Sequence, residues 1–179
     1  MIVVALLRGI NVGKAKRVAM ADLRKVAASL GHTEVKTLLN SGNMVFRAKA
    51  GTPAKIGAAL EQAIEKKLGV KSRVTALSAD ELETIARANV LVKKATNPSL
   101  LLVAFLQGSP DLLEDIAKAK WGTEAIALGP RAAYLWCPNG QIDSPVAKAV
   151  WKALGDGVTA RNWATIEKLR TLVSNPPKP

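Results

Sequence analysis

Histidine and cysteine are almost absent from this chain of 179 residues, which contains one of each, His32 and Cys137. One cysteine excludes an intramolecular disulfide, and the two residues are too few for an ordinary zinc site or a CxxC redox centre. We therefore expect no metal site and no cofactor. His32 follows a helix stop at Gly31 and is expected in a surface turn, whereas Cys137 is expected to be an inert buried thiol.

Long apolar runs are also missing. The longest are Met1–Leu7 and Leu100–Leu106, and both are far shorter than the ~20 residues that a membrane-spanning helix requires. Met1–Leu7 lacks the basic segment and the small-residue cleavage site of a signal peptide. We expect a cytoplasmic protein that does not associate with membranes.

Positive charge is abundant, because 26 Lys and Arg residues outnumber 14 Asp and Glu residues and give a net charge of +12. With 49% hydrophobic and 22% charged residues, the chain can form a core and is no disordered polycation. Residues 1–90 hold 15 basic and 7 acidic residues, against 11 and 7 in residues 91–179. An anionic partner is therefore expected to meet the first half of the chain.

The first half has the pattern strand, helix, two strands, helix, strand. The predicted strands cover 2–7, 35–39, 44–46 and 72–77, and the predicted helices begin near Met20 and at Pro53. Asn40–Asn43 contains residue types that suit a hairpin turn. Thr52-Pro53 is typical of a helix start, and Gly31 and Gly69 are typical of helix ends.

The second half repeats this order approximately. Strands are predicted at 100–106, 124–128, 132–137 and 158–160, with helices after Ser109-Pro110 and after Ser144-Pro145 and a terminal helix from Trp163. The predicted fold is α+β, with two ferredoxin-like (βαββαβ) repeats, antiparallel sheets and an extra C-terminal helix. The expected domains are 1–78 and 100–174, joined by a short helix and linker at 79–99, with a flexible tail at 175–179. Ser78 and Glu81 form a predicted capping box at the start of that short helix.

Arg8–Lys14 is the first motif that suggests chemistry, because its two glycines allow backbone N–H groups to converge where a strand ends and a helix follows. Phosphate groups are bound in this way. The motif is no Walker A loop, since its spacing is Gly-x3-Gly-Lys and Ala15 stands where Ser or Thr would bind magnesium. The alternative is an ordinary glycine-containing turn with solvated lysines.

Topology favours a site, because the first two strands of a ferredoxin-like repeat are parallel. Arg8–Lys14 and Asn40–Asn43 should then lie at the same edge of the sheet and form a polar pocket. The alternative for Asn40–Asn43 is a simple hairpin turn. The candidate ligand-binding residues are Arg8, Gly9, Asn11, Gly13, Lys14, Lys16, Arg17, Ser41, Asn43, Arg161 and Asn162.

Two further groups of residues lie in the second half. Asn162 is the expected N-cap of the terminal helix, a role that leaves Arg161 unexplained, because a cation there faces the positive end of the helix dipole. Tyr134 and Trp136 alternate along one strand and could stack bases, although a core role is favoured.

Three segments of the sequence carry a resemblance to a known family. They are Leu6–Gly13, Ser41–Asn43 with Val45 and Phe46, and Thr159–Trp163 with Lys168 and Leu169. In these segments the chain resembles the uncharacterised bacterial family named domain of unknown function 1697, over nearly its whole length. The resemblance implies a duplicated ferredoxin-like architecture in a small cytoplasmic protein, and it implies no activity. The sequence departs from the family pattern at Lys14 and Ala164, where glycine and asparagine are common.

The leading hypothesis is a binding module for a phosphate-bearing ligand, with nucleic acid or a nucleotide as the ligand class. Cations at Arg8, Lys14, Lys16 and Arg17 would hold phosphate, Asn11, Ser41 and Asn43 would orient it, and Arg161 would close the site. One alternative is a phosphoryl or acyl-phosphate hydrolase with an acylphosphatase-like site, in which Asn40 or Asn43 positions water. Another is a scaffold for protein interactions. Whether the protein is an enzyme stays open at this stage.

Overall fold

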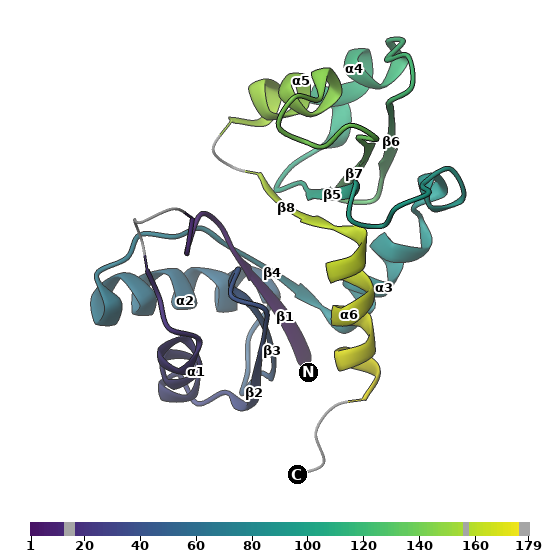
Figure 1. The fold of residues 1–179 in the computed structure, drawn as a ribbon. Helices are drawn as coiled ribbons and strands as arrows, with labels where there is room; N and C mark the ends of the chain where they lie inside the picture. Colours follow the sequence, from purple (N-terminus) through teal and green to yellow (C-terminus); the bar gives the residue numbers. More distant parts are fainter. Residues whose placement is uncertain (13–16, 156–157, 176–179) are drawn as a thin grey trace. The chain divides into compact units, whose positions relative to one another are not determined.

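Two four-stranded antiparallel sheets, each accompanied by helices, place the chain in the mixed α+β class (Figure 1). The computed structural model describes residues 1–12, 17–155 and 158–175. The strands are β1 (Ile2–Leu7), β2 (Thr33–Leu38), β3 (Asn43–Arg47), β4 (Val74–Ser78), β5 (Leu101–Phe105), β6 (Ala125–Gly129), β7 (Ala132–Trp136) and β8 (Thr159–Asn162). The helices of this described part are α1 (Met20–Ser29), α2 (Pro53–Leu68), α3 (Ala79–Arg87), η1 (Val90–Lys93), η2 (Pro110–Leu113), α4 (Glu114–Lys118), α5 (Pro145–Leu154) and α6 (Trp163–Ser174).

The same strand order occurs in both sheets. It is β2-β3-β1-β4 in the first sheet and β6-β7-β5-β8 in the second, so corresponding strands take corresponding places. The two similar halves fit an internal duplication of the chain. By contacts, the chain divides into a first unit of Met1–Leu82 with the residues from Leu169 onward, and a second unit of Glu83–Lys168.

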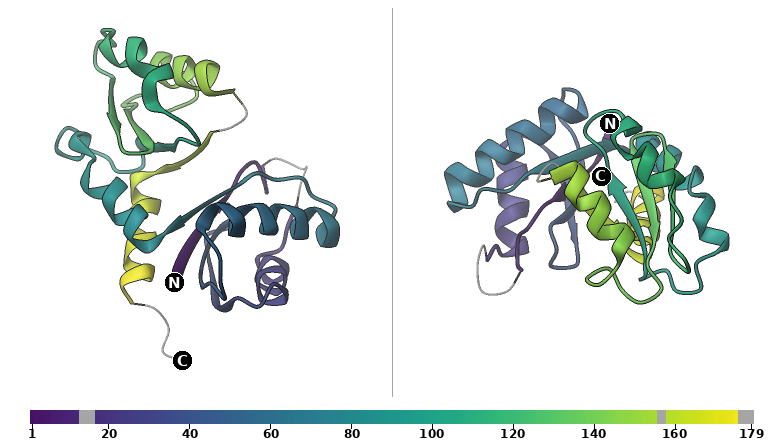
Figure 2. Two further views of the ribbon diagram at one scale, coloured as in Figure 1. Left: turned by 180° about the vertical axis from the view of Figure 1, so that it is seen from behind. Right: turned by 90° about the horizontal axis from the view of Figure 1, so that it is seen from above.

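β1 lies at the centre of the first sheet, between β3 and β4. Its residues from Val3 to Leu7 are at most 1% exposed, as a continuous run of aliphatic residues predicts for a strand that is buried on both faces. Every second residue of β1 joins a core that α1 and α2 complete on one face of this sheet. Figure 1 shows these two helices beside the sheet, and Figure 2 shows them from behind.

α2 begins and ends at its predicted signals. The Thr52 hydroxyl oxygen accepts a hydrogen bond from the backbone N–H of Lys55 at 3.4 Å, and Pro53 is the first helical residue. Gly69 ends the helix with φ at 67°, a left-handed conformation that glycine adopts without steric cost. The predicted capping box is confirmed at the start of α3, where the Ser78 N–H donates to the Glu81 carboxylate at 2.8 Å and the Glu81 N–H donates to the Ser78 hydroxyl at 3.1 Å.

β5 takes the central place in the second sheet. On one face of this sheet, Leu102 and Leu135 pack against Val146 and Val150 of α5. The predicted helix after Ser109-Pro110 is split into the 3₁₀ turn η2 and the short helix α4. α5 begins at Pro145, as predicted from Ser144-Pro145.

The other face of the second sheet is also buried, so the base-stacking alternative for Tyr134 and Trp136 is wrong. Tyr134 is 0% and Trp136 is 5% exposed, and the Tyr134 hydroxyl donates to the Ile85 carbonyl at 2.6 Å. Burial raises the pKa of Tyr134 to about 12. η1 packs against β6 and β7 on this half of the molecule, so these aromatic residues serve the core.

His32 is buried, which corrects its expected place in a surface turn. Its ring stacks on Phe46 with centroids 4.7 Å apart, and its Nδ1 accepts a hydrogen bond from the Lys49 N–H at 3.3 Å. The pairing of Thr33 with Arg47 brings His32 alongside the end of β3. Cys137 is buried as predicted, and burial raises the pKa of its thiol.

The sequence analysis expected no membrane-spanning helix, and the helices of the structure can be checked for this. Among the described residues, no helix combines the length and the apolar character that are needed to cross a bilayer.

Candidate functional site

Three loops of the first unit meet at the edge of the sheet where β1 ends. They are residues 8–12 after β1, residues 39–42 between β2 and β3, and residues 71–73 before β4. The Leu7 N–H donates to the Gly42 carbonyl at 2.8 Å, and the Arg8 N–H donates to the Arg73 carbonyl at 2.9 Å. The predicted juxtaposition of the first two loops is therefore confirmed, because β1 and β2 each run antiparallel to β3 and so end at the same edge.

The Asn11 side chain connects two of these loops. Its amide nitrogen donates to the Val18 carbonyl at 2.9 Å and to the Asn40 carbonyl at 2.8 Å, and its oxygen accepts from the Val18 N–H at 2.8 Å. Asn11 has φ at 55°, in the left-handed region that asparagine tolerates better than most residues. The structure thus shows Asn11 as the residue that closes the loop between β1 and α1 and holds it against the hairpin.

The hairpin turn has a tight interior. Asn43 is wholly buried at the start of β3, and its amide nitrogen donates to the Leu38 carbonyl and to the Ser41 hydroxyl, both at 2.9 Å. A Cβ added at Gly42 would come within 2.7 Å of the Leu7 Cβ and 2.8 Å of the Ile10 Cδ1. Only glycine fits at this point of closest approach. Of the two predicted ligand-orienting residues that lie in this hairpin, Ser41 is exposed and Asn43 is buried.

Ser72 and Arg73 belong to the site and were missed from the sequence. The Ser72 hydroxyl donates to the Arg8 carbonyl at 2.8 Å, which fixes the third loop against the first. Arg73 is exposed beside it. The available signal was a cation near the start of the predicted fourth strand, because this strand is the neighbour of β1 in a ferredoxin-like repeat.

The charged residues of these loops are all cations, although two carboxylates of α2 lie close to the third loop. Lys71 Nζ lies 3.4 Å from Glu65 Oε1, and the Glu61 carboxylate accepts a hydrogen bond from the Val74 N–H at 2.7 Å. Arg8 is half-buried, whereas Arg17 and Arg73 are exposed, and residues 8–12, 17–18, 39–42 and 70–73 contain no Asp or Glu. Gly9 has φ at 67°, and the N–H groups of residues 9–12 donate to no backbone carbonyl within the described part of the chain. Cations and backbone donors at one sheet edge suit an anion. Gly13, Lys14 and Lys16 of the predicted site lie outside the described residues.

Arg161 and Asn162, the last two predicted site residues, lie in β8 of the second unit. The predicted cap is confirmed, because the Asn162 side-chain oxygen accepts from the Thr165 N–H at 2.9 Å and from the Thr165 hydroxyl at 2.8 Å. The Arg161 guanidinium donates to the Ala160 carbonyl at 2.8 Å. Burial lowers the pKa of Arg161 to about 10, since desolvation disfavours the charged form.

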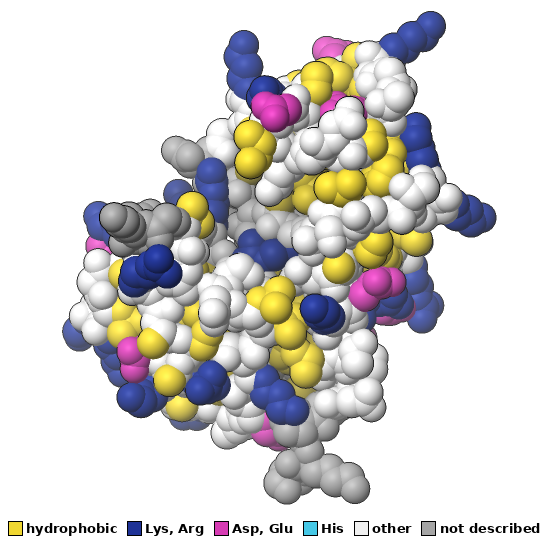
Figure 3. All heavy atoms as spheres, in the orientation of Figure 1, with side chains coloured by type: hydrophobic (Ala, Val, Ile, Leu, Met, Phe, Trp, Pro, Cys, Tyr) yellow, Lys and Arg dark blue, Asp and Glu magenta, His cyan; other side chains and the backbone are white. Residues whose placement is uncertain are grey.

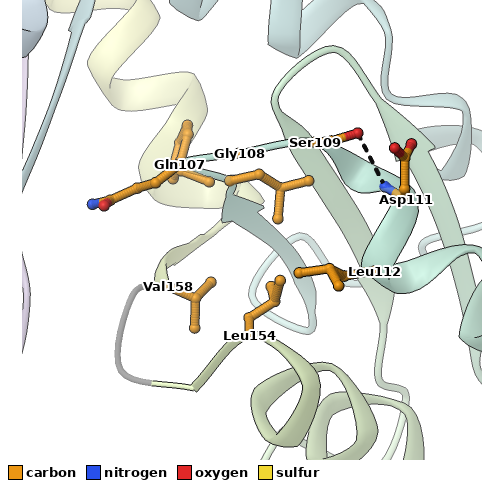
Figure 4. Close-up of a pocket in the computed structure, with 9 residues that line it drawn as sticks. Gln107, Gly108, Ser109, Asp111, Leu112, Leu154 and Val158 are labelled. Atoms are coloured by element: carbon orange, nitrogen blue, oxygen red, sulfur yellow. Dashed lines mark hydrogen bonds between the residues drawn. The ribbon is translucent and has the colours of Figure 1, made fainter.

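A pocket of about 390 Å³ lies at the end of β5 in the second unit. In Figure 4, Leu112 and Leu154 point toward each other across it, and the Gln107 amide extends away from them. Asp111 is the charged residue among the described residues that line it, and its N–H donates to the Ser109 hydroxyl oxygen at 3.4 Å. An apolar pocket with a carboxylate suits no phosphate group, although it takes the same place after β5 that the cationic loops take after β1.

In the comparison with protein families, residues 1–134 match the family described as protein of unknown function (DUF1697). The chain belongs to this family. The match contains the segments of the first unit that form the three loops, but the motif at 159–169 lies outside it, so the matched part is shorter than the resemblance suggested. No curated protein matches the chain.

A solved structure supports the fold over almost the whole chain. The conserved bacterial protein SP0830 from Streptococcus pneumoniae is similar with a TM-score of 0.74 and 20% sequence identity, over 96% of this chain and 98% of that chain. At this identity the likeness concerns the fold alone.

Proposed function

We propose that the first unit binds the phosphate groups of a nucleic acid or a nucleotide at the three loops that follow β1, join β2 to β3 and precede β4. The observation that carries this proposal is the bond from Asn11 to the Asn40 carbonyl. This bond holds the loop after β1, which contains cations and left-handed residues, against the turn between β2 and β3, where Ser41 is exposed. Arg8, Arg17 and Arg73 supply charge-assisted hydrogen bonds in this arrangement.

Each group has a separate role in the proposed site. The arginines contact phosphate oxygens, the N–H groups of residues 9–12 add neutral donors, and the Ser41 hydroxyl adds a side-chain donor. Asn11 and Asn43 act on the loops and not on the ligand, because their amide nitrogens donate to protein acceptors. The net charge of +12 favours an anionic partner, and dark-blue Lys and Arg side chains are more frequent than Asp and Glu on the face in Figure 3.

The hydrolase alternative receives less support from these contacts. An acylphosphatase-like site needs an asparagine amide that is available to position water. Asn43 is 0% exposed, and its amide nitrogen already donates to Leu38 and Ser41. Of the two asparagines that this alternative names, Asn43 is therefore not available to position water, and the exposed Asn40 is left for that role.

The strand order supports a finer description of the fold. We propose that each half is a ferredoxin-like repeat, because each has the element order strand, helix, two strands, helix, strand and the same four-stranded arrangement. In both halves, the long helix before the last strand packs on the face that carries the core.

The salt dependence of oligonucleotide binding tests the proposed function. The intact protein is expected to bind a single-stranded oligothymidylate of about 12 nucleotides, with an affinity that falls steeply as salt rises. Arg8→Ala and Arg73→Ala should each weaken binding by about 1.5–3 kcal/mol and make the log–log salt slope shallower by ~0.7, the contribution of one phosphate contact in single strands.

Lys152→Ala is the matched control, because it removes one positive charge from an exposed position on α5 of the second unit. Its effect on the slope should be negligible, since contacts and not net charge determine counterion release. If Arg8→Ala and Lys152→Ala changed the affinity and the salt slope equally, binding would follow net charge alone, and the proposed site would be contradicted. Fluorescence anisotropy at several salt concentrations measures both quantities.

A further inference from the structure

Leu39 occupies a position that suits a leucine poorly. Its side chain is 50% exposed, and its backbone has φ at 57°. A bulky residue in the left-handed region has a steric cost that asparagine and glycine largely avoid. An exposed aliphatic side chain also contributes little hydrophobic stabilisation. Neither burial nor turn geometry therefore accounts for leucine at this position, and such local conflicts tend to mark functional residues.

Val12 is a second exposed aliphatic residue at the same edge of the sheet. It is 69% exposed and follows Asn11 in the chain. Leu39 precedes Asn40, and the bond of 2.8 Å between the Asn11 amide nitrogen and the Asn40 carbonyl holds the two loops together. The two aliphatic side chains thus stand on joined loops, and the charged residues of segments 8–12, 17–18 and 39–42 are Arg8 and Arg17.

The combination of aliphatic side chains and cations suits a ligand that has apolar surfaces next to phosphates. Single-stranded nucleic acid has this chemistry, because its bases are not paired and can place their faces on protein side chains. A duplex hides these faces inside its stack. We propose that Val12 and Leu39 contact the bases of a single-stranded nucleic acid whose phosphates the arginines bind. This inference rests on the proposed function.

A pair of probes separates base contact from phosphate contact. The first is an oligothymidylate of about 12 nucleotides, and the second is an abasic phosphodiester chain of the same length. The protein should bind oligothymidylate more tightly than the abasic chain. Leu39→Asn should weaken oligothymidylate binding by roughly five- to tenfold, the loss expected when part of an aliphatic contact is removed. The Leu39→Asn variant should keep the wild-type dependence of affinity on salt concentration and the wild-type affinity for the abasic chain.

Controls distinguish this loss from misfolding. Asparagine accepts the left-handed backbone better than leucine, so Leu39→Asn should melt at the same temperature as the wild type or higher. Ile142→Asn is the matched control, because Ile142 is 82% exposed and lies in the second unit. It should leave both affinities unchanged. Val12→Ser repeats the test at a residue with no special turn geometry and should show the same loss for oligothymidylate alone.

Two results would overturn the inference, and they differ in what they leave intact. If both probes bind equally and Leu39→Asn and Val12→Ser change neither affinity, base contact is excluded and phosphate binding stands. If neither probe binds at low salt, the proposed function fails together with the inference.

Discussion

His32 is the single histidine of the sequence and lies in the core of the first unit, 7% exposed. Burial lowers its pKa below the ordinary value of 6.5, because desolvation disfavours the imidazolium form. Its Nδ1 accepts from Lys49, and its Nε2 has no partner among the described residues. The neutral ring is therefore the form that packs on Phe46.

This lowered pKa predicts a loss of stability on acidification. The unfolded chain binds a proton near pH 6.5 while the folded chain does not, so the free energy of unfolding should fall as the pH drops below about 6.5, by at most ~1.4 kcal/mol per pH unit. Urea unfolding of the wild type at about pH 7.5 and 5.5 measures this loss. His32→Gln should lack most of it, whatever its own stability, and an identical pH dependence in both proteins would contradict the assignment.

Asn11 is predicted to support binding without contacting the ligand. Asn11→Gly keeps the left-handed backbone and removes the three side-chain hydrogen bonds to Val18 and Asn40. It should lower the free energy of unfolding by ~1–3 kcal/mol and weaken oligonucleotide binding at an unchanged net charge. Urea unfolding and anisotropy measure the two effects. A variant as stable as the wild type that binds normally would show that the loop needs no such support.

At the scale of elements, the N-terminus of α5 shows how a buried helix end is satisfied. The Ser144 hydroxyl oxygen accepts from the Ala147 N–H at 3.1 Å, and the Glu124 carboxylate accepts from the Val146 N–H at 3.0 Å. Both side chains are buried, at 1% and 8% exposed. A carboxylate at this end of a helix also interacts favourably with the helix dipole.

The two N-caps should differ in their contribution to stability. Ser144→Ala is expected to cost ~1–2 kcal/mol, because it leaves a buried N–H without its acceptor. Thr52→Ala should cost less than ~1 kcal/mol, since Thr52 is exposed, its bond is 3.4 Å long, and water can replace it. Urea unfolding of both variants makes the comparison. A larger loss for Thr52→Ala would mean that burial does not determine the strength of these caps.

At the scale of the whole molecule, the two halves share a strand order but differ in the chemistry at the end of their central strands. After β1 the chain has cations and left-handed residues, whereas after β5 it has an apolar pocket with Asp111. Surface loops change without disturbing the buried sheet beneath them. The halves therefore share one strand order but differ in the chemistry of these loops, and the proposed site belongs to the first half.

The sequence by itself determined most of the elements. Continuous aliphatic runs predicted β1 and β5, and Thr52-Pro53, Ser144-Pro145 and the Ser78–Glu81 capping box predicted where helices begin. These signals are local, since they depend on side chains within a few residues of one another. The adjacency of the loops after β1 and between β2 and β3 also followed from the sequence, because the repeated order of elements restricts the sheet to few topologies.

Only the tertiary structure showed which partners each candidate site residue has. The sequence suggested that the Asn11 and Asn43 amides bind a ligand. In the structure, however, their amide nitrogens donate to the backbone carbonyls of Val18, Asn40 and Leu38. His32 looked like a surface residue until strand pairing placed it on Phe46. Arg73 joined the site only through the third loop. Hydrogen-bond partners and burial depend on residues that are distant in the chain, so no local pattern of residue types reveals them.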